Sequence, residues 1–225
     1  MAERSSIFDM VGPIMVGPSS SHTAGVVRIA RAAIRVLGSK PESAEIIFYN
    51  SFARTYEGHG SDRAILAGLM DFKTDDSRIK NALDIAKEEG LKYTFKSVGN
   101  ASIYHPNTVK LILTSKEKKI EVVGESLGGG LINIAYVNGF RANISLNLHT
   151  LILNADDKKG AIAFIANVIA NDEVNIATMS VSRIGKNDRA SHFIEMDGGL
   201  NPITIEYLKN LYWIKEVIYI PNIDM

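Results

Sequence analysis

Apolar positions at helical spacing begin at residue 24, and they predict an amphipathic helix over residues 24–38. The apolar positions on one face of this helix are Val26, Ile29, Ala30, Ala33, Ile34 and Leu37. Arg28, Arg31 and Arg35 fall on the other side, and we expect solvent to surround them; a docking surface for an acidic partner is the alternative. Gly38 is placed to end the helix.

The pattern then predicts a mixture of helices and strands up to residue 137. Helical spacing recurs at residues 63–70 and 79–89. Short apolar or alternating runs predict strands at residues 44–49, 92–98, 109–114, 120–125 and 131–137. Because most of the helices precede most of the strands, the first region is predicted to be α+β.

A new pattern starts near residue 147. It predicts strands at 147–153, 176–184, 190–196 and 214–220, with helices at 161–169 and 203–211. The order βαββαβ is that of a ferredoxin-like domain. We therefore divide the chain into a domain of residues 1–146 and a domain of residues 147–225.

Composition narrows the classes of partner. The 225 residues carry 25 Lys or Arg and 25 Asp or Glu, so bulk charge favours neither nucleic acid nor a membrane surface. No apolar run reaches the roughly 18 residues of a membrane-spanning helix, and residues 1–6 do not read as a signal peptide. We therefore expect a cytoplasmic protein. The chain has no cysteine, so it forms no disulfide and binds no metal through cysteine.

Residues 17–23, Gly-Pro-Ser-Ser-Ser-His-Thr, contain the closest cluster of hydroxyl and imidazole side chains, just before the first predicted helix. Unpaired N–H groups and the helix dipole make a helix start attractive to carboxylate or phosphate. His22 adds a group that exchanges protons near neutral pH. The segment suits an amino acid or hydroxy acid substrate, although helix capping alone would also explain its hydroxyl residues.

The second domain resembles an ACT domain, a small module that binds amino acids and regulates metabolic enzymes. The turn of residues 157–160, Asp-Lys-Lys-Gly, stands where this family has an Asp-x-Pro-Gly-like turn, with Lys159 in place of proline. The resemblance implies effector binding at Asp157, Gly160 and Asn175, and a homodimer formed through this domain. An ACT fold kept for dimerisation alone is the alternative.

Four motifs occur in order in the first domain and give it a second resemblance. They are residues 14–25 (Ile-Met-Val-Gly-Pro-Ser-Ser-Ser-His-Thr-Ala-Gly), 58–64 (Gly-His-Gly-Ser-Asp-Arg-Ala), 105–108 (His-Pro-Asn-Thr) and 126–130 (Ser-Leu-Gly-Gly-Gly). Together with residues 6–13 and the ACT-like region, they resemble the beta subunit of iron–sulfur-dependent L-serine dehydratase. The fold implied for residues 1–146 is similar to the allosteric-substrate-binding domain.

This resemblance implies an activity shared between two chains. The family converts L-serine to pyruvate and ammonia, and its alpha subunit carries a four-iron four-sulfur cluster held by cysteines. The cluster is thought to act as a Lewis acid on the serine hydroxyl. Because cluster ligands are thiolates and this chain has none, we expect the cluster on an alpha partner and no metal on this chain. We also expect this chain to be inactive alone.

Candidate roles follow for individual residues. His59, between two glycines, is the preferred general base, and His22 a helper that orients the anion or assists proton transfer. Arg63 is a candidate partner of a carboxylate, while Asp62 either caps the following helix or holds a histidine tautomer. Hydroxyl and N–H groups that bind the substrate carboxylate are expected at Ser19, Ser20, Ser21 and Thr23.

Some segments keep two interpretations. The resemblance to the allosteric-substrate-binding fold implies an interface or effector role for residues 105–107, and a rigid turn before a strand is the alternative. Residues 128–130 lack the strand-to-helix context of a phosphate loop, so we expect close backbone packing against the partner or substrate there. His149 and His192 are interpreted as structural. For the whole chain, the alternatives to an enzyme subunit are a regulatory module that binds serine and a structural interaction protein.

Overall fold

The computed structural model describes residues 14–222 except 102, 184 and 187. The motif residues 6–13 therefore lie outside the described part. The fold is mixed α+β with two sheets, and the chain divides into two compact units between Asn138 and Gly139. Among the described residues, no helix has the length and apolarity needed to cross a bilayer.

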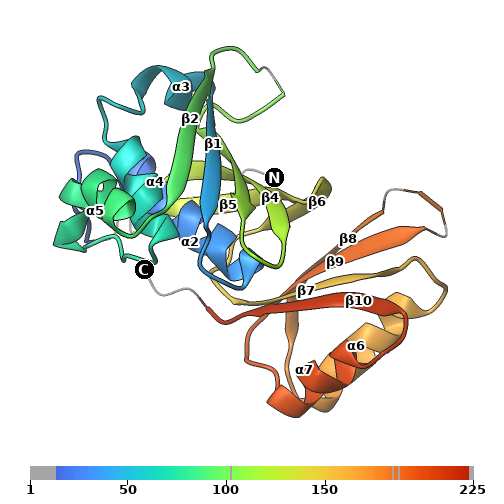
Figure 1. Ribbon diagram of the computed structural model, residues 1–225. Coiled ribbons are helices and arrows are strands. Elements are labelled where there is room, and N and C mark those ends of the chain that lie inside the picture. The colour runs from blue at the N-terminus through green and yellow to red at the C-terminus, as the bar shows by residue number, and fades with distance from the viewer. Residues whose placement is uncertain (1–13, 102, 184, 187, 223–225) are drawn as a thin grey trace. The chain divides into compact units, whose positions relative to one another are not determined.

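The first unit places helices on one face of a sheet (Figure 1). Its helices are π-helix η1 (Ser20–Ala24), α2 (Gly25–Leu37), α3 (Asn50–Thr55), α4 (Ser61–Leu69), the 3₁₀ helix η2 (Ser77–Asn81) and α5 (Ala82–Glu88). Its strands are β1 (Ser43–Tyr49), β2 (Lys92–Val98), β3 (Thr108–Thr114), β4 (Lys119–Gly128) and β5 (Leu131–Val137). The strand order within this unit is β2-β1-β3-β4-β5. The next strand, β6 (Phe140–Ile144), follows the division at Asn138. β1 runs parallel to β2 and antiparallel to β3.

Helix α2 is the centre of the first core, because it contacts β3, β4 and β5 on one side and α4 on the other. The expectation of a solvated arginine face is therefore wrong for two of its three residues. Arg28 is 2% exposed and donates to the carbonyl of Gly130, and Arg31 is 6% exposed and pairs with Asp71. Arg35 also pairs with Asp71, at 2.6 Å, but at the surface.

Two elements escaped the sequence pattern. Helix α3 has six residues, too few for helical spacing to show, and it follows β1 without a break at Asn50, whose φ is 52°. β6 has alternating buried and exposed positions, but with five residues it gives a weak signal. The helix expected at residues 79–89 is divided between η2 and α5.

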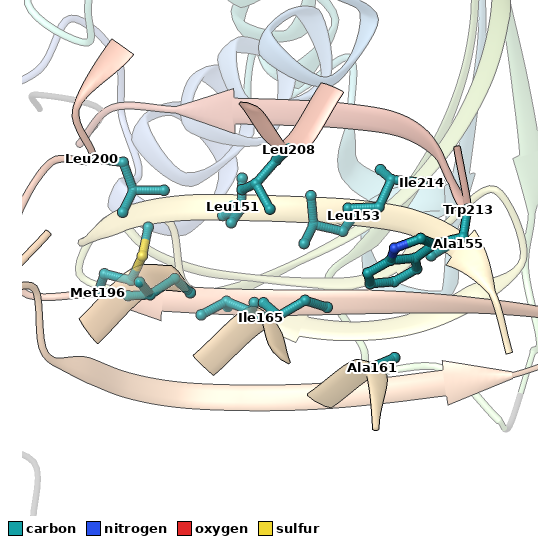
Figure 2. Close-up of a cluster of buried hydrophobic side chains, with 12 residues drawn as sticks. Leu151, Leu153, Ala155, Ala161, Ile165, Met196, Leu200, Leu208, Trp213 and Ile214 are labelled. Atoms are coloured by element: carbon teal, nitrogen blue, oxygen red, sulfur yellow. The ribbon is translucent and has the colours of Figure 1, made fainter. Parts of the chain in front are cut away.

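The second unit contains the elements expected in the order β-α-β-β-α-β. They are β7 (His149–Asp156), α6 (Ala161–Asn171), β8 (Ile176–Arg183), β9 (Arg189–Met196), α7 (Pro202–Lys209) and β10 (Ile214–Ile220). The sheet order is β10-β7-β9-β8, and its pairs are antiparallel. Figure 2 shows the core between sheet and helices, where Leu151 and Leu153 meet Ile165, Leu208 and Trp213.

The other face of this second sheet holds a buried carboxylate. Glu195 is 5% exposed, and its Oε1 accepts hydrogen bonds from Ser145 N, Ser145 Oγ and Leu146 N at 2.7–3.0 Å. Thr178 Oγ1 donates to Oε2 at 3.3 Å. The segment that follows β6 is thus tied to the second sheet. The division at Asn138 precedes the sequence boundary at 146–148, and residues 145 and 146, just before that boundary, are hydrogen-bonded to Glu195 of the second unit.

Candidate functional site

The hydroxyl-rich segment forms the start of the first helix, as expected. Ser19 is the N-cap residue, and its Oγ accepts the N–H of His22 at 3.3 Å, which confirms the capping prediction. The first turn is a π-helix, in which the N–H of Gly25 reaches the carbonyl of Ser20. Single π-turns inside helices are rare and occur often at functional sites.

His22 is held at both ring nitrogens. Nδ1 lies 3.0 Å from Ser21 Oγ and 3.2 Å from Ser19 Oγ, and Nε2 lies 3.1 Å from Thr55 Oγ1. Thr55 Oγ1 donates its proton to the carbonyl of Ser51 at 2.8 Å, so it accepts from His22. Nε2 therefore carries the proton, and Nδ1 accepts from the serine hydroxyls.

His59 lies against the same residues. Gly60 has φ 71°, a left-handed conformation that suits glycine, and it separates the turn after α3 from α4. The rings of His59 and His22 stack with centroids 4.7 Å apart. Nδ1 of the exposed His59 lies 3.3 Å from the carbonyl of Thr55, which can only accept. Nδ1 is therefore the donor, and Nε2 has no hydrogen bond to any described residue.

The two histidines differ in environment. Burial lowers the pKa of His22 from its usual 6.5, and the neighbouring His59 lowers it further. Since His59 is exposed, its ring can meet a substrate or a partner chain. Asp62 is partly buried, which raises its pKa, and its Oδ1 accepts the N–H of Arg63 at 2.8 Å. Asp62 thus accepts a backbone N–H in the first turn of α4. The carbonyl of Thr55, and not Asp62, keeps the proton of His59 on Nδ1.

The remaining predicted substrate ligands lie nearby in different settings. Ser20 contributes its carbonyl to the π-turn. Thr23 is 1% exposed and packs on Gly17, where a Cβ would overlap its side chain; its hydroxyl has no partner among the described residues. Arg63 is exposed on the first turn of α4. Ser19 and Ser21 therefore contact the histidine pair, whereas Thr23 faces the interior.

The other two motifs meet the same region. The N–H of Ser51 donates to the carbonyl of Pro106, and the N–H of Ser126 donates to the carbonyl of Asn107, both at 2.9 Å. Ser126 is fully buried beside Gly25, where a Cβ would overlap its Oγ. Arg28 bonds Gly130 at 2.7 Å. All four motifs thus surround the starts of α2 and α3.

Three residues of α3 that support the site were not predicted from the sequence. Thr55 contacts both histidines, and the ring of Phe52 meets His22 edge-on at 5.0 Å. Asn50 Nδ2 donates to the carbonyls of Ala101 and Tyr104, at 3.0 and 3.1 Å, while Oδ1 accepts the N–H of Ala101. The feature that distinguishes Asn50 is its positive φ, which is a property of the folded backbone and cannot be read from the sequence.

The expected effector residues separate into two places in the second unit. Asp157 contacts Arg183 at 3.3 Å, and Gly160 precedes α6 with φ 82°. Asn175 lies beyond the other end of α6, where Nδ2 donates to Asp197 at 2.7 Å. Since an 11-residue helix is about 16 Å long, one chain does not bring Asn175 to the other two.

The donor atoms of this chain do not fit an iron–sulfur cluster. Such clusters are held by cysteine thiolates, and the full sequence contains no cysteine. The site instead offers imidazoles, hydroxyls and backbone N–H groups, which bind anions and transfer protons.

Comparison with known proteins shows which family this chain resembles. Residues 6–135 match the family described as Serine dehydratase beta chain. A "Probable L-serine dehydratase, beta chain" of Bacillus subtilis is 42% identical over 96% of this chain and 98% of its own. The "L-serine dehydratase, beta chain" of Peptoniphilus asaccharolyticus is 35% identical over 91% of each. The chain belongs to the serine dehydratase beta chain family.

Proposed function

We propose that this chain is the beta subunit of an L-serine ammonia-lyase, which converts L-serine to pyruvate and ammonia together with an alpha subunit. The observation that carries the proposal is the stacked pair His22 and His59 beside the hydroxyl-lined start of α2. Relatives named L-serine dehydratase, beta chain, span nearly all of this chain. The cysteine-ligated four-iron four-sulfur cluster belongs to the alpha partner.

In this proposal each group has a defined task. The helix start and the hydroxyls of the serine segment bind the substrate carboxylate, with Arg63 at the edge. Nε2 of His59 takes the proton from Cα, and the electron pair of the Cα–H bond forms the Cα–Cβ double bond of aminoacrylate as the Cβ–O bond breaks. The hydroxide that leaves would be accepted by a Lewis acid on the alpha partner. Tautomerisation and hydrolysis of aminoacrylate then release ammonia and pyruvate. His22, held by Ser19, Ser21 and Thr55, orients the carboxylate or assists the proton transfer.

Reconstitution tests this assignment directly. The chain is co-expressed anaerobically with a cysteine-rich alpha chain, and pyruvate formation from L-serine is measured. We expect turnover by the complex and none by this chain alone. An active isolated chain, or an inactive complex whose cluster is intact, would contradict the proposal.

A regulatory role for the second unit is a second proposal. We infer that this unit is an ACT domain that pairs in a homodimer and binds an amino acid at Asp157, Gly160 and Asn175. Its support is the β-α-β-β-α-β order of the elements. Because Asn175 and Gly160 lie apart in one chain, the proposed site would take these residues from two copies. Calorimetry of the isolated chain with L-serine, alongside Gly160→Val, tests it. Equal binding by both proteins would contradict an effector site at Gly160.

A further inference from the structure

Thr55 is the residue through which both histidines of the site are joined. Its hydroxyl lies 3.1 Å from Nε2 of His22, and its carbonyl lies 3.3 Å from Nδ1 of His59. No other described residue is hydrogen-bonded to both rings. Thr55 is half-buried at the last position of α3, one turn after Ser51, to which its hydroxyl donates.

The direction of these hydrogen bonds is fixed by the atoms available. A carbonyl oxygen only accepts, so His59 donates from Nδ1. The one proton of the Thr55 hydroxyl is directed to the carbonyl of Ser51, so His22 donates from Nε2. The two rings therefore hold opposite tautomers, although they stack 4.7 Å apart.

We propose that Thr55 is a positioning residue that fixes both tautomers, and thereby leaves Nε2 of His59 as the nitrogen that accepts the substrate proton. The effect of Thr55 on the reaction rests on the proposed lyase function, whereas its effect on the two tautomers does not. A tautomer with the proton on Nε2 would leave His59 unable to act as a base at that atom. The hydroxyl also keeps Nδ1 of His22 available to the hydroxyls of Ser19 and Ser21.

The geometry is tested in the isolated full chain by nitrogen-15 NMR of the histidine side chains at a pH where they are neutral. Single His→Asn variants assign the five histidines. We expect the proton on Nε2 in His22 and on Nδ1 in His59. Thr55→Val removes the hydroxyl but keeps the carbonyl, so the His22 tautomer becomes mixed while that of His59 persists. Thr55→Ser restores the wild-type signature of His22.

The consequence is tested in the reconstituted complex with L-serine. Thr55→Val lowers kcat by about tenfold or more with little change in KM, because the ring of His22 loses its fixed position beside His59. Thr55→Ser recovers most of the rate. Thr94→Val is the matched control, because Thr94 is exposed on β2 and has no such contact. We expect it to change neither spectra nor rate.

Two results would contradict the positioning role and the lyase function separately. An unchanged His22 tautomer in Thr55→Val, with a folded chain by circular dichroism, would show that the hydroxyl does not hold the ring. Matching wild-type tautomers with an inactive wild-type complex would instead contradict the lyase function and leave the positioning role supported. If Thr55→Val does not fold, Thr55→Ala gives the same comparison without the added methyl group.

Discussion

The two units each contain a network of polar side chains, and the networks differ in how completely they are satisfied. In the second unit, the carboxylate of Glu195 accepts four hydrogen bonds and is nearly inaccessible. In the first unit, a chain of bonds from Ser19 through His22 to Thr55 ends beside His59, whose Nε2 has no bond to the described residues. A satisfied network stabilises a fold, whereas an open atom is available for chemistry.

The largest expected effect tests the open end of the first network. His59→Asn in the reconstituted complex removes the proposed base, so kcat for L-serine falls by about 10² to 10⁴. The free energy of unfolding stays nearly constant because His59 is exposed. Pyruvate formation and urea denaturation measure the two quantities. Activity within a few-fold of wild type would remove His59 from its assigned role.

The satisfied network responds in the opposite way. Glu195→Ala leaves four donors around Ser145, Leu146 and Thr178 without their acceptor, and we expect a loss of about 3 kcal/mol in the free energy of unfolding. Glu195→Gln keeps one oxygen for the three donors at Oε1 and should lose about 1 kcal/mol. Urea titration measures both. Equal losses would show that the cluster of donors at Oε1 is not what matters.

A third test concerns the packing beneath the site. Gly25→Ala places a Cβ in the space of Ser126 Oγ and should cost about 1–3 kcal/mol of stability. Ser126→Gly in the same chain should recover part of that loss, since the two side chains compete for one space. Thermal denaturation of the two single variants and the double variant gives the coupling. Additive losses would show that the overlap is relieved elsewhere.

The smallest effect is a pH dependence. The pKa of His22 is lowered below 6.5 by burial and then by His59, so the unfolded chain binds this proton more readily than the folded one. The site therefore loses stability as the pH falls below about 6.5, until the folded-state pKa is passed. His192 contributes in the same direction because burial lowers its pKa too.

The experiment compares the pH dependence of unfolding for wild type, His22→Asn and His192→Asn. Each variant should show a shallower loss of stability on acidification than wild type. His59 provides a control on the cause: His59→Asn removes the smaller of the two influences on His22 and should leave most of the slope. An unchanged slope in His22→Asn would contradict the assigned direction.

Prediction from sequence succeeded where periodicity carries the information. Strand β2 and strand β5 were predicted with their observed bounds, and α2 within a residue, because apolar residues recur at regular spacing in the sequence there. Arg28 and Arg31 were misjudged because periodicity gives the face of a helix but not what covers that face. Arg28 meets a carbonyl 102 positions away in the chain.

The site was predictable as a set of motifs but not as an arrangement. Capping by Ser19 follows from local chemistry, so it was foreseen. Thr55 was not, because its role depends on a six-residue helix and on two histidines 33 and 4 positions away. Tautomers in particular depend on which acceptor each ring nitrogen meets in space, and residue types alone do not specify that.

The π-turn at Ser20–Ala24 sets the direction in which His22 points relative to the buried face of α2, because the turn and the helix are continuous. In an α-helix each residue turns the chain by about 100°, so one residue gained or lost within this turn would rotate His22 away from Thr55 by that angle. The burial of α2 would remain as it is, because the shift arises before Gly25. Length at this turn, and not only residue type, therefore decides whether the two imidazoles meet.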